Sequence, residues 1–136
     1  MFLTKECDYA IRVIRALADL DKKPVKTICD LEYIPRPFAY KILKKLEYAG
    51  IVLSSRGVTG GYRLMKTPGT LTIYDIVSAV ADELLVNECL LDDYNCQRNS
   101  NGSLCGVHNE MSRIQEIIIL ALKEKNVAEV VEYFPE

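Results

Sequence analysis

The side chains best suited to chemistry lie close together in one stretch of the sequence. Cys89, Cys96 and Cys105 and the only histidine of the chain, His108, fall between positions 89 and 108. Thiolate sulfur and imidazole nitrogen are donors that bind iron and zinc in proteins. On ligand chemistry alone, this set suits an iron-sulfur cluster and a zinc ion equally, while a redox pair of thiols and an inert loop are two further interpretations.

The rest of the sequence indicates that these thiols are reduced. The first residues, MFLTKECDYAIR, lack the pattern of a secretory signal, and the longest apolar run, EIIILAL, is too short to cross a membrane. We therefore expect a cytoplasmic protein without membrane association, whose five cysteines are ligands, redox groups or core residues rather than disulfides. Cys7 and Cys29 fall within predicted helices and are interpreted as core thiols.

The composition is typical of a globular protein and does not suggest an enzyme. The chain has 136 residues, of which 49% are hydrophobic and 26% charged, which is enough for one domain with a core. No grouping of serine, carboxylate or glycine residues is typical of a catalytic site, and the sole histidine leaves no general base for one. We therefore expect no enzymatic activity.

The net charge of -2 conceals two segments of opposite charge. Between residues 36 and 66 the chain has seven cations and one anion, whereas between residues 67 and 111 it has one cation and seven anions. The seven cations are Arg36, Lys41, Lys44, Lys45, Arg56, Arg63 and Lys66. Such a basic segment is typical of a surface that binds a polyanion, although exposed lysines are more often simply solvated.

Hydrophobic periodicity predicts three helices and a hairpin in the first half of the chain. Thr4 caps a first helix that ends near Leu20, and a short second helix covers residues 25–33 with Ile28 and Leu31 facing inward. A third helix extends to Gly50, and the residues IVLSS and YRLM on either side of the turn RGVTGG predict a β-hairpin. Helix, turn, helix, hairpin is the element order of a winged helix.

The second half is predicted to be helical on both sides of the cysteine stretch. Thr72 with Asp75 forms a capping box for residues 73–84, and Asn126 with Glu129 forms another for residues 127–134. Between them, apolar residues recur at helical spacing from 111 to 122. We therefore expect a mainly α fold with a small β-hairpin, in which a winged helix-turn-helix DNA-binding domain precedes a long C-terminal dimerisation helix.

The basic third helix and the hairpin together suit double-stranded DNA. A helix with cations on its outer face fits the major groove, and an arginine near a hairpin tip, here Arg56, can enter the narrower minor groove. The order of the elements and the single acid between residues 36 and 66 favour DNA binding over a merely solvated surface.

The stretch IPRPFAYKILKKLEYAGIVLSSRGVTGGYRL resembles the winged-helix transcription repressor family of IscR, NsrR and CymR. The likeness extends from LTKECDYAIR at the start to CGVH and the helix after it, and so covers nearly the whole chain. It implies that bases are read by Pro35, Pro37, Tyr40 and Lys41, with Arg56 in the minor groove. The residues expected at the DNA are Pro35, Arg36, Pro37, Tyr40, Lys41, Lys44, Lys45, Arg56, Gly60 and Arg63.

The resemblance also favours iron among the interpretations of the cysteine stretch. Cluster-binding members of this family carry three cysteine ligands in the corresponding loop, which implies an iron-sulfur cluster held by Cys89, Cys96 and Cys105. With His108 as the fourth ligand the cluster is expected to be of the [2Fe-2S] type. Asp8, lent across a dimer, is the alternative fourth ligand.

Members of this family are homodimers, so the resemblance implies three parts in this chain. Residues 1–83 form the DNA-binding domain, whose first helix also packs at the dimer interface; residues 84–107 form the cluster-binding loop; and residues 108–136 form the dimerisation helix and a short terminal helix. A two-fold dimer places its recognition helices about 34 Å apart and implies a palindromic operator.

The expected function is therefore that of a transcription repressor whose DNA affinity changes with the state of the cluster. Oxidants, nitric oxide or iron supply would be the signal. The alternative is a regulator without a cluster that is controlled by a partner protein or a small ligand, as CymR is. A zinc-binding or thiol-redox regulator is a further alternative.

Overall fold

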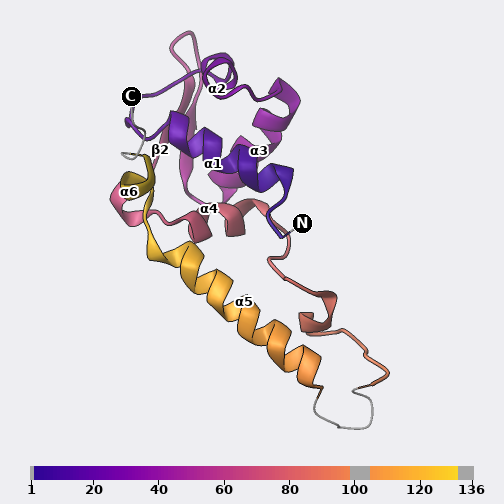
Figure 1. Cartoon of the computed structure of the whole chain (residues 1–136). Coiled ribbons are helices and arrows are strands. Elements are labelled where there is room, and N and C mark those ends of the chain that lie inside the picture. Colours follow the sequence, from indigo (N-terminus) through magenta and orange to yellow (C-terminus); the bar gives the residue numbers. More distant parts are fainter. Residues whose placement is uncertain (1, 99–104, 132–136) are drawn as a thin grey trace.

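The expected winged-helix order is present in the computed structural model, which describes residues 2–98 and 105–131. Three helices, α1 (Lys5–Ala16), α2 (Val25–Glu32) and α3 (Arg36–Tyr48), precede an antiparallel hairpin of β1 (Val52–Ser55) and β2 (Gly61–Leu64). The chain continues through η1 (Pro68–Thr70), α4 (Ile73–Val80), η2 (Glu88–Leu90), α5 (Gly106–Glu124) and α6 (Val127–Val131). The fold is thus mainly helical with one small hairpin, as predicted (Figure 1).

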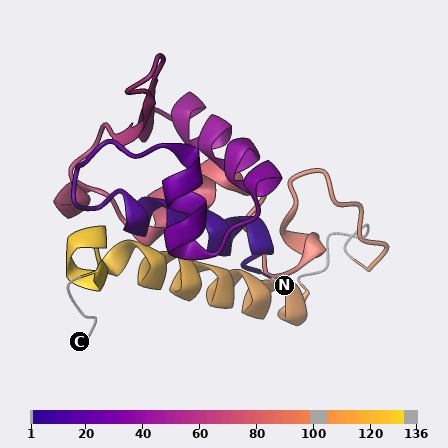
Figure 2. The same ribbon diagram turned by 90° about the horizontal axis from the view of Figure 1, so that it is seen from above.

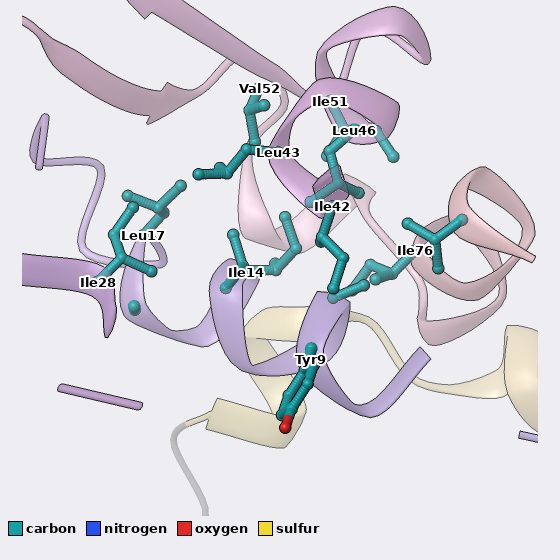
Figure 3. Close-up of a cluster of buried hydrophobic side chains, with 14 of the residues drawn as sticks. Tyr9, Ile14, Leu17, Ile28, Ile42, Leu43, Leu46, Ile51, Val52 and Ile76 are labelled. Atoms are coloured by element: carbon teal, nitrogen blue, oxygen red, sulfur yellow. The ribbon is translucent and has the colours of Figure 1, made fainter. Parts of the chain in front are cut away.

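Helix α1 lies at the centre of the core and contacts α2, α3 and α4. Its buried face meets α3 and α4 through aliphatic side chains that are fully excluded from solvent, among them Ile14, Ile42, Leu46 and Ile76 (Figure 3). Burial of such side chains is the main favourable contribution to folding, so the hydrophobic core fixes α3 relative to α1.

The first helix begins where the sequence predicts and ends earlier. The Thr4 hydroxyl accepts a hydrogen bond from the Cys7 amide at 3.4 Å and caps the helix. The last helical residue is Ala16, however, and the prediction that the helix ends near Leu20 was wrong by about one turn. Leu20 has a φ of 68°, in the left-handed region that a right-handed helix excludes, so the chain has already turned there.

The prediction that Leu31 faces inward was wrong. Leu31 is 54% exposed, and the neighbouring Glu32 is buried instead. The Glu32 carboxylate accepts a hydrogen bond from Arg15 Nε at 2.9 Å, and the Glu32 carbonyl accepts one from Arg12 at 3.2 Å. A carboxylate is tolerated in a core only when it is paired, so this ion pair ties α1 to the end of α2.

The hairpin, or wing, is held in place by a third segment. The Lys23 amide donates to the Tyr62 carbonyl at 2.9 Å and the Tyr62 amide donates to the Lys23 carbonyl at 2.8 Å. This close approach requires glycine at position 61, because a Cβ there would lie 2.5 Å from the Lys23 carbonyl oxygen. Gly60 is constrained similarly by the Ser55 carbonyl oxygen, at 2.6 Å. The wing is therefore fixed against the body of the domain.

Both capping boxes predicted from the sequence are confirmed. The Thr72 amide donates to the Asp75 carboxylate at 2.9 Å, and the Asp75 amide donates to the Thr72 hydroxyl at 3.1 Å. The corresponding distances between Asn126 and Glu129 are 2.8 and 3.0 Å. The predicted extension of the last helix to Phe134 lies outside the described residues, which end at 131.

Helix α4 ends at Val80, four residues before the predicted end. Ala81 is extended, and the chain after it runs beside α5. There the Gln115 side chain of α5 forms hydrogen bonds with backbone groups of residues 84 and 86. Its amide oxygen accepts from the Val86 amide at 2.8 Å, and its amide nitrogen donates to the Leu84 carbonyl. This contact between residues far apart in sequence supplies the backbone partners that further helical turns would otherwise provide.

Candidate nucleic-acid interface and cysteine loop

An open groove separates α3 from the wing and contains the main cationic side chains. Arg36, Tyr40 and Lys44 recur every fourth residue and so share one face of α3, while Arg56 comes from the turn of the wing. Gly60 lines the same groove. Helix α3 and the wing lie at one edge of the molecule, on the side opposite to α5 (Figure 2). This arrangement exposes a cationic surface that a partner can approach freely.

The amino-terminal end of α3 is formed by the two candidate prolines. Pro35 is the N-cap residue and Pro37 lies in the first turn, where a missing amide proton costs no hydrogen bond. Both side chains are exposed, and the first turn contains no acidic residue. The positive end of the helix dipole therefore remains available to an anion.

Lys41 and Lys45 point to a different part of the molecule from the other predicted DNA contacts. Both donate to the carboxylate of Glu6 on α1, and the distance from Lys45 Nζ is 2.9 Å. Lys45 also donates to the Val80 carbonyl at the end of α4, at 2.9 Å. Of the cations on α3, Arg36 and Lys44 line the wing groove, whereas Lys41 and Lys45 face α1 and α4. Lys44 also borders the hollow next to α4 that Lys41 and Lys45 line.

Arg63 also lies outside the groove. Side chains alternate between the faces of a strand, and Tyr62 lines the groove, so Arg63 lies on the other face of the wing. There it borders a separate hollow with Leu20, Asp21 and Leu53. Of the ten predicted DNA residues, five line the groove: Arg36, Tyr40, Lys44, Arg56 and Gly60. Pro35 and Pro37 lie at the start of α3, and Lys41, Lys45 and Arg63 face other parts of the surface.

Sequence reasoning missed Glu47, which links the wing to α3. Its carboxylate accepts hydrogen bonds from the Ser54 amide, at 3.2 Å, and from the Ser54 hydroxyl. Burial raises the pKa of the nearby Tyr62 hydroxyl, and the Glu47 charge adds to this effect, so the phenol stays protonated. Glu47 was missed because its partner is an ordinary strand residue with no signal in the sequence.

The cysteines fall into two classes by burial. Cys7 and Cys29 are buried, which confirms their interpretation as core thiols. Burial also raises the pKa of the Cys29 thiol above its ordinary value. Cys89, Cys96 and Cys105 are partly exposed. A partly exposed thiol can reach a ligand, whereas a buried one is shielded from it.

The three exposed thiols come from three different local structures. Cys89 lies in η2, Cys96 follows in the irregular chain, and Cys105 is the N-cap residue of α5 without a capping side-chain hydrogen bond. His108 lies in the first turn of α5, three residues after Cys105, and is also partly exposed. Positions i and i+3 share a face of a helix, so these two donors lie on the same side of the start of α5.

The donor set fits an iron-sulfur cluster in chemistry and accessibility, but its members are spread out. Within residues 2–98 and 105–131, no three histidine, cysteine or acidic side chains lie close enough together to hold a metal. Binding would therefore require the segment around Cys89 and Cys96 to close toward the start of α5. Asp8 is paired with Arg12, at 3.0 Å, on its own helix.

Helix α5 presents a long surface that the rest of the chain leaves uncovered. None of its 19 residues, all of them described, is buried. Ile117 is 51% exposed and Leu120 is 68% exposed, while Lys123 lies over the Tyr74 ring of α4 at 4.4 Å from its centre. One side of α5 thus contacts α4 and the other is exposed and partly apolar. No helix in the described part of the chain is long and apolar enough to cross a membrane.

The sequence matches a family of transcriptional regulators and individual proteins named as such regulators. Residues 3–133 match the Rrf2 family, described as iron-dependent transcriptional regulators. The regulator NsrR of Bacillus licheniformis is 25% identical over 136 residues, covering 96% of this chain and 92% of that protein. A relative from Aquifex aeolicus, named as a helix-turn-helix regulator, is 33% identical over 94 residues; the match spans 69% of this chain and 65% of that relative.

Solved structures show the same fold. CymR, the global cysteine regulator of B. subtilis, is superimposed with a TM-score of 0.73 at 20% identity, covering 97% of both chains. IscR of T. potens gives a TM-score of 0.75 at 17% identity, covering 98% of this chain and 91% of that chain.

Proposed function

The chain belongs to the Rrf2 family of transcriptional regulators, and we propose that it is a cytoplasmic repressor that binds a palindromic operator as a homodimer. Its relatives are regulators and not enzymes. The observation that carries this proposal is the groove in which Arg36, Tyr40 and Lys44 of α3 face Arg56 of the wing. Three exposed cations on two elements suit a helix in the major groove and a hairpin in the adjacent minor groove.

The proposed dimer forms through α5. Its uncovered side carries Ile117 and Leu120, two large apolar residues whose exposure to water is unfavourable. A helix of 19 residues is about 28 Å long, which is sufficient for packing against the same helix of a second copy. A two-fold axis along this contact would place two α3 helices on successive turns of DNA.

The proposed sensor is an iron-sulfur cluster held by Cys89, Cys96, Cys105 and His108. Such a cluster, when bound, supplies sensitivity to oxidants, nitric oxide or iron supply. The chain itself supplies four soft donors on a segment that adjoins α5. Binding would order the cysteine loop and thereby fix the start of the dimerisation helix, which sets the relative position of the two DNA-binding domains. Residues 1–83, 84–107 and 108–136 remain the proposed division of the chain.

A second candidate is a regulator controlled by a partner protein or a small ligand without a cluster. The separation of the donor side chains within the described residues favours it. The solved CymR structures share the fold. Zinc in place of iron and thiol oxidation are variants of the same donor set. Metal analysis distinguishes iron from zinc, and DNA binding before and after oxidation distinguishes a thiol switch from control by a partner.

We predict different effects for two neighbouring lysines of α3. Lys44→Ala should flatten the dependence of log affinity on log salt by about 0.9, because it removes one cation from the DNA groove. Lys45→Ala should leave this slope unchanged, because that side chain is bound to Glu6 and Val80. Fluorescence anisotropy with a random duplex over a salt series measures both slopes. Equal flattening in the two variants would place both lysines at the phosphates.

Arg56→Ala should weaken binding to the operator more than binding to random duplex. An arginine in a narrow minor groove reads groove width, so its removal should cost about 1–3 kcal/mol of discrimination. The operator is first selected from a random library with the wild-type protein, and both affinities are measured at one salt concentration. Arg63→Ala is the matched comparison on the far face of the wing and should lose less. Equal losses of Arg56→Ala on both duplexes would reduce Arg56 to a phosphate contact.

A further inference from the structure

Glu6 joins the first turn of α1 to two consecutive turns of α3. One carboxylate oxygen accepts from Lys41 and the other accepts from Lys45, at 2.9 Å. The Glu6 side chain is only 24% exposed, whereas that of Lys41 is 56% exposed. The hydrogen bond from Lys41, followed by that from Lys45, holds the pKa of Glu6 below its usual range. Glu6 is therefore ionised at neutral pH and stays beside the recognition helix.

The two lysines differ in what else holds them. Lys45 also donates to the Val80 carbonyl and is 30% exposed, so it would remain in place without Glu6. Lys41 lies at the surface next to Lys44 along α3 and donates its hydrogen bond to Glu6; the Asp82 carboxylate adds a weaker attraction without a hydrogen bond. Lys41 is thus the cation whose availability depends on Glu6.

A phosphate group would have to compete with Glu6 for Lys41. An exposed ion pair is weak, so DNA could displace the carboxylate from the ammonium group. The Glu6 charge would nevertheless remain beside the phosphate and oppose its approach. Lys41 would then contribute little to non-specific attraction, although its position on α3 is close to the groove.

We infer that Glu6 limits the electrostatic attraction of α3 to DNA, because it neutralises Lys41 so that α3 binds DNA through Arg36 and Lys44 in the wing groove. This inference rests on the proposed DNA-binding function. Its consequence is weaker and less salt-dependent binding to every DNA sequence alike, because phosphate contacts are common to all of them.

The test is the salt dependence of Glu6→Gln on a random duplex. The amide keeps the shape of the side chain and removes its charge, so one additional phosphate contact should steepen the log-log slope by about 0.9. Binding to random duplex and binding to the selected operator should tighten by similar factors. The double variant Glu6→Gln/Lys41→Ala should return to the wild-type slope, because the released cation is then absent.

Two controls separate the charge of Glu6 from other effects. Glu110→Gln removes a carboxylate that pairs with Arg113 on α5, and it should leave the slope unchanged. Glu6→Asp keeps the charge with a shorter reach and should resemble wild type, whereas a role in side-chain shape alone would be kept by Glu6→Gln and lost in Glu6→Asp. Thermal unfolding verifies that each variant is folded.

Failure of the proposed DNA binding and failure of the proposed role of Glu6 give different results. Wild-type protein that binds neither the selected operator nor random duplex would overturn the proposed function and this inference with it. Wild-type protein that binds DNA, together with a Glu6→Gln variant of unchanged slope and unchanged affinity for both duplexes, would overturn the role of Glu6 alone.

Discussion

Replacing Ile117 with glutamate is expected to convert the proposed dimer into a monomer. Ile117 lies near the middle of α5 on its uncovered side, where a second copy of the helix would bury it. A buried, unpaired carboxylate in an apolar contact costs several kcal/mol, which exceeds what one helix pair can readily compensate. Glutamate is a good helix former, so α5 itself should persist.

Sedimentation and operator binding measure this effect together. Loss of the dimer should lower operator affinity by about 10²- to 10⁴-fold, because the two half-sites are no longer bound by one molecule. Asn109→Asp adds the same charge to an exposed position of α5 without removing an apolar side chain, and it should remain dimeric. A dimeric Ile117→Glu protein with wild-type operator affinity would show that the copies meet elsewhere or that the chain acts alone.

Replacing Cys105 with serine is expected to abolish cluster binding. Serine keeps the size of the side chain but replaces soft thiolate sulfur with a hydroxyl that iron-sulfur clusters rarely use. Because Cys105 makes no capping side-chain hydrogen bond and is only partly buried, the variant should remain a folded dimer. Anaerobically reconstituted Cys105→Ser should be colourless and lack iron and acid-labile sulfide.

Two comparison variants identify the ligand set. Cys29→Ala removes a thiol outside the cysteine loop and should leave the colour of the protein intact. His108→Ala should give a weaker or spectrally altered cluster if His108 is the fourth ligand, and a wild-type spectrum if Asp8 serves instead. A Cys105→Ser protein with the wild-type cluster content would remove Cys105 from the proposed set.

Local interactions were the part of the fold that the sequence predicted well. Both capping boxes join residues three positions apart, so a short pattern contains the whole interaction. The end of α1 was mispredicted although it is marked locally by the left-handed Leu20, whereas the end of α4 depends on a contact from elsewhere. The chain after α4, for example, is satisfied by Gln115, which lies about 30 positions further along the sequence.

In the candidate site, too, local patterns were predictable from the sequence and contacts between distant residues were not. The basic face of α3 was predictable from its spacing, yet charge counting within residues 36–66 could not reveal that Glu6 pairs with Lys41, because 35 positions separate them. Arg63 was placed at the DNA on charge alone, although strand alternation with Tyr62 directs it to the other face of the wing. The burial of Glu32 in place of Leu31 likewise depends on a distant partner, Arg15.

The cysteine loop was recognisable by composition but its arrangement was not. Three thiols and an imidazole within a short stretch indicate a ligand set, and partial exposure of all four side chains agrees with that role. The spacing of Cys89, Cys96 and Cys105 has neither helical nor strand periodicity, so only the relation of Cys105 to His108 was predictable. The relative positions of the four ligand side chains would be set by the bound group rather than by the local backbone.

The central claim, that an iron-sulfur cluster controls DNA binding, is tested most directly by the operator affinity of one anaerobic preparation before and after exposure to nitric oxide. The account predicts a coloured protein whose affinity changes by about 5- to 150-fold as the cluster is lost, which corresponds to a coupling of about 1–3 kcal/mol. A colourless protein after anaerobic reconstitution, with the same operator affinity before and after exposure, would contradict it and favour control by a partner or small ligand.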